Sequence, residues 1–256
     1  MARICLWNSF VLEKRMRPQP IQRHTLPSLL LVLLAWTGVC QVPPNSVARQ
    51  DSGKWEAEIS AFEAGDRTNP PPKNCIVFVG SSSIRFWSSL KTDFPGFPVV
   101  NRGFGGSELA DSVNLAERLI IPYQPRQVVV YAGGNDLAGG KEPEIVFGDF
   151  VALVNKIHQH LPDAHVDFIA CAPNPKRWAI VEKVRKLNSL VAAYCRENQL
   201  GFIDVFPLML GGDGQPKPDI FREDRLHMNA KGYALWKDAV APHLRAGSPQ
   251  IQGDRR

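Results

Sequence analysis

Hydroxyl and amide side chains stand directly after short apolar runs of this chain, and a carboxylate and an imidazole stand close together late in it. The first such group is three consecutive serines, Ser81, Ser82 and Ser83, which follow the apolar run that ends at Gly80. A serine at a strand-to-helix turn can act as a nucleophile with its oxygen at the positive end of the helix. Backbone amides at the same place can instead cradle an anion, and serine also commonly caps a helix. The serines alone leave these three roles open.

Glycine-rich segments follow the next two apolar runs. Residues 103–106 are glycine at three of four positions, which lets a backbone approach another group closely. Residues 133–136 read Gly-Gly-Asn-Asp, so an amide and a carboxylate follow a buried strand through two glycines. The side chain of Asn135 can donate a hydrogen bond into a pocket, whereas an ordinary turn is the structural alternative.

A carboxylate and an imidazole are spaced for contact late in the chain. Asp224 stands three residues before His227, directly before an apolar helix that is expected to begin near Asn229. In a turn, such an aspartate reaches one ring nitrogen of the histidine, which fixes the tautomer and leaves the other nitrogen free as a base. Four further histidines lack this setting and are expected at the surface: His158, His160, His165 and His243.

Five apolar runs have the character of strands that are buried on both faces, as in a parallel sheet. They cover residues 76–79, 99–100, 128–131, 166–171 and 202–205. Apolar residues spaced by three and four predict amphipathic helices over 146–157 and 180–194. A short helix is also expected over 55–62, before the prolines that follow Asn69. This alternation predicts a doubly wound α/β sandwich.

The side chains that could carry out chemistry follow three of the predicted strands. Ligands of open α/β sheets bind outside the carboxyl ends of the strands. The serines, the glycine-rich segments and Asn135 are therefore expected to meet at one edge of the sheet. The chain shows no internal repeat and no second domain.

These four segments, in this order, resemble the sequence blocks of the SGNH hydrolases, also called GDSL-type esterases. The family's blocks are Gly-Asp-Ser, a glycine, Gly-x-Asn-Asp and Asp-x-x-His. Their counterparts here are residues 80–82, Gly106, residues 133–136 and residues 224–227, and residues 227–233 look like the family's His-x-Asn-x-x-Gly-Tyr. The resemblance spans about residues 55–243. The chain has no Gly-x-Ser-x-Gly elbow, which counts against the α/β-hydrolase family.

The resemblance implies a three-layer α/β/α sandwich with a central, mainly parallel five-stranded sheet, which is flavodoxin-like in its layers. It also implies a serine esterase in which Ser82 attacks an ester carbonyl, His227 takes the serine proton and Asp224 orients His227. The oxyanion would be held by the backbone N–H groups of Ser82 and Gly106 and by the side-chain amide of Asn135. This chemistry needs no metal and no organic cofactor.

One position departs from the family pattern. Ser81 stands where the family has an aspartate. Since that aspartate is not the triad acid, the catalytic set is kept. Counting from Gly80 makes Ser82 the nucleophile, with Ser81 and Ser83 as the alternatives.

The substrate is expected to be a small-molecule or glycan ester with a short acyl group, acetyl above all, because no long leucine-rich lid is visible. A polysaccharide O-deacetylase, a lysophospholipase and a thioesterase are the alternatives within the enzyme class. Outside it, a flavodoxin-like module that binds an anion or a glycan is the alternative, but such a module leaves Asn135, Asp224 and His227 without a role.

Four charged residues are candidates for substrate binding by their place in the sequence. Arg85, Arg102 and Arg177 lie near the predicted pocket and could bind an anionic substrate group. Solvated or structural arginines are the commoner case. Asp136 is a further candidate, and its structural alternative is to support the neighbouring Asn135.

The composition is that of a globular protein, since 44% hydrophobic and 21% charged residues exclude a disordered or collagen-like chain. The formal net charge of +5 comes mainly from the first 40 residues, because the rest holds 25 basic and 24 acidic residues. No nucleic-acid partner is therefore expected, and no stable membrane partner beyond the leader. Cys75, Cys171 and Cys195 show neither a disulfide framework nor metal-ligand spacing and are expected to be small buried residues.

The first 40 residues have the order of a secretory signal peptide: a basic stretch, an apolar run over 29–36 and then small residues. The run is shorter than the roughly 20 residues of an ordinary transmembrane helix, which argues against a membrane span. The alternative to a signal peptide is an uncleaved amphiphilic anchor. Met16 would start a leader of more usual length. Cys40 lies where bacterial lipoproteins carry a lipidated cysteine, although Val39 is not the small residue that usually precedes it. Export to the periplasm or the cell exterior is expected.

The predicted layout is a signal peptide over 1–40, a linker over 41–53, one hydrolase domain over 54–246 and a polar tail over 247–256.

Overall fold

The computed structural model describes residues 52–247. The predicted signal peptide, with Met16 and Cys40, therefore lies outside the described residues, as does nearly all of the predicted linker and tail. Between residues 52 and 247, no helix has the length and apolar character needed to cross a membrane.

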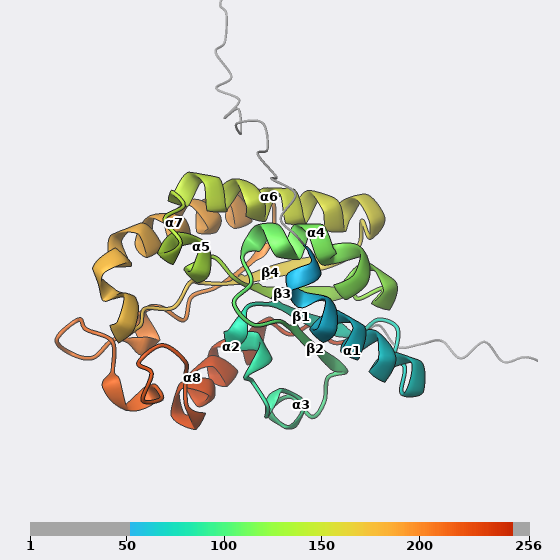
Figure 1. Ribbon diagram of the computed structural model, residues 1–256, viewed down its shortest axis with the longest axis horizontal. Helices are drawn as coiled ribbons and strands as arrows, with labels where there is room; N and C mark the ends of the chain where they lie inside the picture. Colours follow the sequence, from blue (N-terminus) through green and yellow to red (C-terminus); the bar gives the residue numbers. More distant parts are fainter. Residues whose placement is uncertain (1–51, 248–256) are drawn as a thin grey trace, which may run out of the picture. The chain divides into compact units, whose positions relative to one another are not determined.

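Five parallel strands form the central sheet in the order β2-β1-β3-β4-β5 (Figure 1). The strands are β1 (Ile76–Gly80), β2 (Val99–Gly103), β3 (Gln127–Tyr131), β4 (His165–Ile169) and β5 (Gly201–Ile203). Gly80 at the end of β1 lies level with Gly103 on one side and Tyr131 on the other. The three loops that leave these strand ends, which carry the serines, Gly106 and Asn135, therefore start side by side.

The strands are buried on both faces because helices cover each side of the sheet. Val77 and Val79 of β1 belong to one hydrophobic cluster, and the alternate residues Ile76 and Phe78 belong to a second. This period of two is the side-chain alternation of a strand. Each fully buried Val, Ile or Phe side chain contributes about 1.5–3 kcal/mol relative to exposure. The continuous apolar runs of the sequence thus reflect two cores, one on each face.

The helices form the outer two layers. The first cluster includes residues of α1 (Glu56–Thr68), α4 (Leu109–Leu119), α6 (Pro143–His160) and α7 (Val181–Glu197). The second includes residues of α2 (Ser82–Arg85), α3 (Leu90–Asp93) and α8 (Ala230–Val240). Figure 1 shows α4, α6 and α7 on one side of the sheet and α2, α3 and α8 on the other. The short helix α5 (Gly134–Ala138) follows β3.

Short 3-10 helices join these elements within the described residues. They are η1 (Ser52–Trp55), η2 (Ile121–Tyr123), η3 (Pro175–Ile180), η4 (Pro207–Met209), η5 (Pro218–Ile220) and η6 (Ala241–His243). The three-layer sandwich with a five-stranded parallel sheet is the fold predicted from the sequence.

The predicted elements differ from the observed ones mainly at their ends. The apolar runs over 166–171 and 202–205 extend beyond β4 and β5, because the ladder between these strands ends at Ile169 and Ile203. Cys75, Cys171 and Cys195, the cysteines among the described residues, are buried, as expected. His165 is less exposed than a surface histidine: its side chain is 14% exposed and lies beside the buried Asp167 at 3.6 Å. The reason is that His165 opens β4 rather than ending a helix.

Candidate active site

The turn between β1 and α2 sets the position of the serines. Gly80 has φ +131°, and a Cβ atom there would lie 2.0 Å from the carbonyl oxygen of Tyr131, so only glycine fits this close approach. Ser81 follows in extended conformation and its N–H donates to the same Tyr131 oxygen at 2.9 Å. Ser82 is then the first residue of α2, where backbone N–H groups have no acceptor within the helix.

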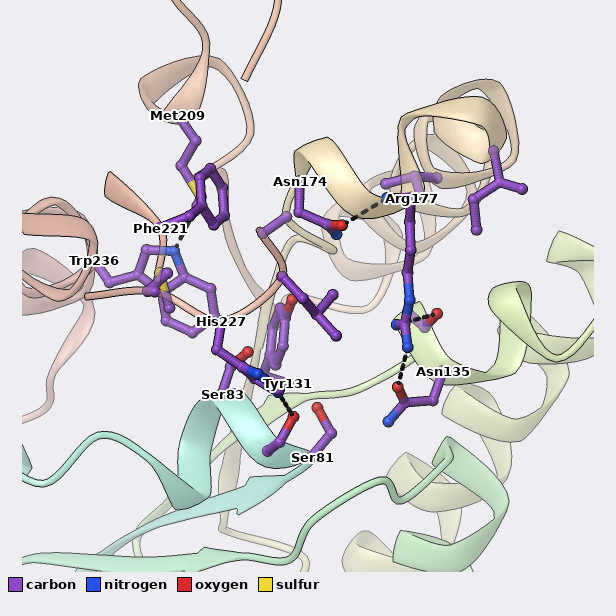
Figure 2. A pocket seen from close by; sticks show the side chains of 17 residues that line it. Ser81, Ser83, Tyr131, Asn135, Asn174, Arg177, Met209, Phe221, His227 and Trp236 are labelled. Atoms are coloured by element: carbon purple, nitrogen blue, oxygen red, sulfur yellow. Dashed lines mark hydrogen bonds between the residues drawn. The ribbon is translucent and has the colours of Figure 1, made fainter. Parts of the chain in front are cut away.

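A continuous hydrogen-bonded chain joins three of the predicted residues. Ser82 Oγ lies 2.9 Å from His227 Nε2, and His227 Nδ1 lies 2.5 Å from Asp224 Oδ2. In Figure 2, His227 points toward the serines at the start of α2. The neighbouring serines Ser81 and Ser83 also line the pocket, but the contact to His227 is made by Ser82.

The turn before His227 fixes the position of the Asp224 carboxyl group. Asp224 Oδ1 accepts hydrogen bonds from the backbone N–H groups of Leu226 and His227, each at 2.9 Å, which leaves Oδ2 for the imidazole. Desolvation opposes ionisation of this carboxyl, but the hydrogen bonds from His227 and Leu226 hold the pKa of Asp224 well below its usual range. Asp224 is therefore ionised at neutral pH, with Oδ2 in contact with the imidazole Nδ1. The Phe86 ring packs edge-on against the imidazole, with ring centroids 4.9 Å apart.

The glycine loop after β2 is held by a tryptophan. Trp55 Nε1 donates to the carbonyl oxygen of Gly105 at 2.8 Å. The next residue, Gly106, has φ +72°, a left-handed conformation that favours glycine. The carbonyl of Ser107 then accepts a hydrogen bond from Asn135 Nδ2 at 2.9 Å, so this loop and the Asn135 loop are joined directly.

Asn135 lies in the first turn of α5, and its side-chain amide has a defined orientation. Nδ2 donates to the Ser107 carbonyl, and Oδ1 accepts from Arg177 Nη2 at 3.0 Å. Figure 2 shows the Arg177 guanidinium directed at Asn135. One of the two Nδ2 protons is used by Ser107, and the other is left for a ligand.

The pocket around these groups is small. It is lined by Ser82, Asn135 and His227 together with apolar side chains, and its volume is about 40 Å³. The large wall residues labelled in Figure 2 are Tyr131, Met209, Phe221 and Trp236. Their contribution was not visible in the sequence, because they come from four separate segments that only the fold brings together.

Two of the candidate arginines do not line this pocket. Arg102 is buried, with Nη2 2.5 Å from Asp66 and Nε donating to the Tyr123 hydroxyl at 2.8 Å. Arg85 forms an ion pair with Glu58 at 2.9 Å, and its side chain is about half exposed. Both therefore pair with carboxylates of α1. Arg177, in contrast, lines the pocket.

Asp136 is likewise outside the pocket lining. It is fully buried, accepts from the backbone N–H of Leu109 at 3.2 Å and lies 3.4 Å from Lys141 Nζ. Lys141 also reaches Glu108 at 3.0 Å and Asp149 at 3.3 Å. Burial raises the pKa of Asp136 to about 6, against the opposing charge of Lys141. Asp136 therefore has the supporting position beside Asn135 that was its structural alternative.

The residues described here contain no group of three or more His, Cys, Asp or Glu side chains arranged to hold a metal ion.

Comparison with known proteins addresses the family. The model of the GDSL-like lipase/acylhydrolase family matches residues 79–235, which contain all four sequence blocks. No curated protein sequence matches the chain.

Solved structures share the fold. A candidate acylhydrolase from Bacteroides fragilis aligns over 73% of this chain and 96% of its own, with 22% identity and a TM-score of 0.65. A GDSL-like lipase from Bacteroides thetaiotaomicron aligns over 73% and 97%, with 20% identity and a TM-score of 0.63. A catalytic mutant of an acetylxylan esterase from Geobacillus stearothermophilus aligns over 67% and 94%, with 13% identity and a TM-score of 0.55. Together with the family match, the chain belongs to the GDSL-like lipase/acylhydrolase family and is an SGNH-type ester hydrolase.

Proposed function

We propose that this enzyme hydrolyses esters of short acyl groups, acetyl esters above all, with Ser82 as its nucleophile. The observation that carries the proposal is the hydrogen-bonded chain from Ser82 through His227 to Asp224 at the mouth of a small pocket. Nucleophile and base are within the reach that proton transfer requires, and the base is held by a third group.

The reaction proceeds in two halves. Ser82 Oγ attacks the ester carbonyl carbon while its proton passes to His227 Nε2, and the carbonyl oxygen becomes an oxyanion. The tetrahedral intermediate collapses to an acyl-enzyme as the protonated His227 gives its proton to the leaving alcohol. Water then attacks the acyl carbonyl carbon while His227 Nε2 takes the water proton. As this second tetrahedral intermediate collapses, His227 gives that proton to Ser82 Oγ and the carboxylic acid leaves.

Three donors are assigned to the oxyanion: the backbone N–H groups of Ser82 and Gly106 and the free Nδ2 proton of Asn135. The position of Ser82 at the start of α2, the left-handed Gly106 and the hydrogen bond between the two loops support this assignment. Such donors are fixed before the reaction and act where negative charge develops, so each lowers the barrier substantially.

The size of the pocket supports a short acyl group. One water molecule needs about 10–15 Å³ of such a cavity, so 40 Å³ has room for about three small groups. A carbonyl with a methyl group fits that space, whereas a long acyl chain does not. The walls include the bulky Tyr131, Met209 and Trp236, and Trp236 Nε1 is tied to Met209 Sδ at 3.3 Å. This disfavours a lysophospholipase.

A polysaccharide O-deacetylase is the second candidate. The observation that favours it is a groove of about 390 Å³ that shares Phe221 with the small pocket. Trp178, Gln215 and Arg225 line this groove and offer an aromatic face with polar groups around it, as a sugar would require. The acetyl group would then enter the small pocket while the sugar lies outside it.

The test is hydrolysis of p-nitrophenyl esters from acetate to palmitate by the purified chain, with Ser82→Ala beside it. We expect the highest kcat/KM on acetate, a steep fall beyond butyrate and no turnover by the variant. Acetylated xylan and an acetyl thioester, assayed for acetate release, separate a deacetylase from a thioesterase. A palmitate optimum would contradict the proposed acyl group, and an active Ser82→Ala protein would contradict the proposed nucleophile.

We further propose that residues 1–40 direct export of the enzyme. N-terminal sequencing of protein recovered from the periplasm or medium of an expressing bacterium would find a start at or just after residue 40. Full-length protein confined to the cytoplasm would contradict export, and acyl-modified Cys40 would indicate a lipid anchor.

A further inference from the structure

Among residues 52–247, Arg177 is the one charged side chain that lines the small pocket and is not part of the hydrogen-bonded chain to Ser82. It belongs to η3, after β4. Its guanidinium donates twice to the Asn135 loop: Nη1 to the carbonyl oxygen of Gly134 at 2.9 Å, and Nη2 to Asn135 Oδ1 at 3.0 Å (Figure 2). Two hydrogen bonds from one rigid planar group fix the distance and the direction of the Asn135 side chain.

The chemistry of the two neighbours decides which way the amide faces. Arginine has only donors, so the atom of Asn135 that faces Arg177 must be the oxygen. The Ser107 carbonyl has only an acceptor, so the atom that faces it must be the nitrogen. A flipped amide would lose both hydrogen bonds and turn its NH2 group toward the guanidinium.

The charge of Arg177 is directed at the amide. Across residues 52–247, none of the ion pairs of carboxylates with arginine, lysine or histidine includes Arg177. A cation that donates to the carbonyl oxygen of an amide polarises it, which makes the N–H at the other end a stronger donor. The Arg102 guanidinium, by contrast, is paired with Asp66.

We propose that Arg177 is a positioning residue that locks Asn135 with one N–H toward the oxyanion and strengthens that N–H as a donor. The proposal rests on the proposed function, because it assigns Asn135 to the oxyanion. It differs from the expectation that Arg177 binds an anionic substrate group, since the guanidinium already uses two donors on the Asn135 loop.

Arg177→Ala isolates the side chain. The backbone N–H of residue 177, which donates to Asn174 Oδ1 at 3.0 Å, is kept in this variant, so the start of η3 is preserved. We expect kcat to fall about 10- to 100-fold with KM little changed, because losing an oxyanion donor outright costs roughly 100- to 1000-fold. Arg196→Ala is the matched control, since Arg196 is an exposed arginine of α7.

Three readouts separate positioning from a merely structural role. The fall in kcat should be equal for neutral and anionic esters, and free guanidinium at low concentration should restore part of it. In an Asn135→Ala background, Arg177→Ala should change kcat less than threefold, since coupled residues are not additive. The rate at which a fluorophosphonate modifies Ser82 should fall in parallel, which gives a measurement that needs no knowledge of the substrate.

The outcomes are distinct. A wild-type protein that neither hydrolyses esters nor reacts with the fluorophosphonate would refute the proposed function and this inference with it. An active wild-type enzyme matched by Arg177→Ala would refute the inference alone. A loss confined to KM on anionic esters would assign Arg177 to substrate binding instead. Full additivity of the two substitutions would also overturn the positioning role.

Discussion

Replacing Asp224 by asparagine should remove the base without removing the fold. In the wild-type turn, Oδ1 accepts two backbone N–H groups and Oδ2 accepts His227 Nδ1. Asparagine has one acceptor oxygen. If that oxygen keeps the two backbone hydrogen bonds, the NH2 group faces Nδ1, and the ring must hold its proton on Nε2. In that tautomer Nε2 cannot accept the Ser82 proton.

The expected size of the effect is about 1,000- to 10,000-fold in kcat. A buried triad aspartate changed to asparagine costs on the order of 10,000-fold, and Asp224, with its side chain 40% exposed, allows water to replace part of the interaction. The assay is p-nitrophenyl acetate hydrolysis near pH 8, with melting temperature as the check on folding. Asp219→Asn is the matched control, because Asp219 is exposed and pairs with Lys231 at 3.1 Å. A loss of kcat below tenfold in a folded Asp224→Asn protein would refute the proposal that Asp224 sets the tautomer of His227.

Asn135→Ala should lower kcat on the same ester roughly 100- to 1000-fold with little change in KM, because one oxyanion donor is removed; unchanged kcat would exclude it from the oxyanion site. Lys141→Ala should lower the free energy of unfolding by about 2 kcal/mol at neutral pH, because three carboxylates lose their cation. This deficit in unfolding free energy is measured as a lower midpoint of urea denaturation. Because the pKa of Asp136 is raised by burial, its ionised form opposes folding, so this deficit should shrink as the pH falls below about 6; a deficit that grows in acid would contradict the pairing. Gly80→Ala should lower the free energy of unfolding by about 3 kcal/mol or more, which is roughly 6–12 °C in melting temperature, because its Cβ would overlap the Tyr131 carbonyl oxygen. A stable, active variant would contradict this close approach of Gly80 to Tyr131.

Much of the fold follows from local sequence signals. Strands that are buried on both faces have to be apolar throughout, so the runs at 76–79 and 128–131 identified β1 and β3 almost to the residue. The helix over 180–194 was visible because its apolar stripe packs on one cluster only. The sheet order and helix α4 were not predicted. The order depends on which strands pair across long loops, which no local pattern records.

The site was predictable where short-range geometry suffices. Asp224 and His227 are three positions apart, and one turn brings them into contact. The roles of the arginines were not predictable, because proximity in sequence says nothing of the partner. Arg102 forms a salt bridge with Asp66 of α1, which is 36 positions away in the sequence. Arg177 donates a hydrogen bond to Asn135, which is 42 positions away. Nearness to a motif therefore placed Arg102 and Asp136 among the substrate-binding candidates, although both point into the protein.

Ser82, and not Ser81 or Ser83, is expected to form the covalent intermediate. The most direct measurement is mass spectrometry of the protein after reaction with a fluorophosphonate, with the modified residue located by peptide fragmentation. We expect one adduct per chain, on Ser82, which is absent in Ser82→Ala and much slower to form in His227→Ala. An adduct on Ser81 or Ser83, or equal labelling of the His227→Ala protein, would contradict this expectation.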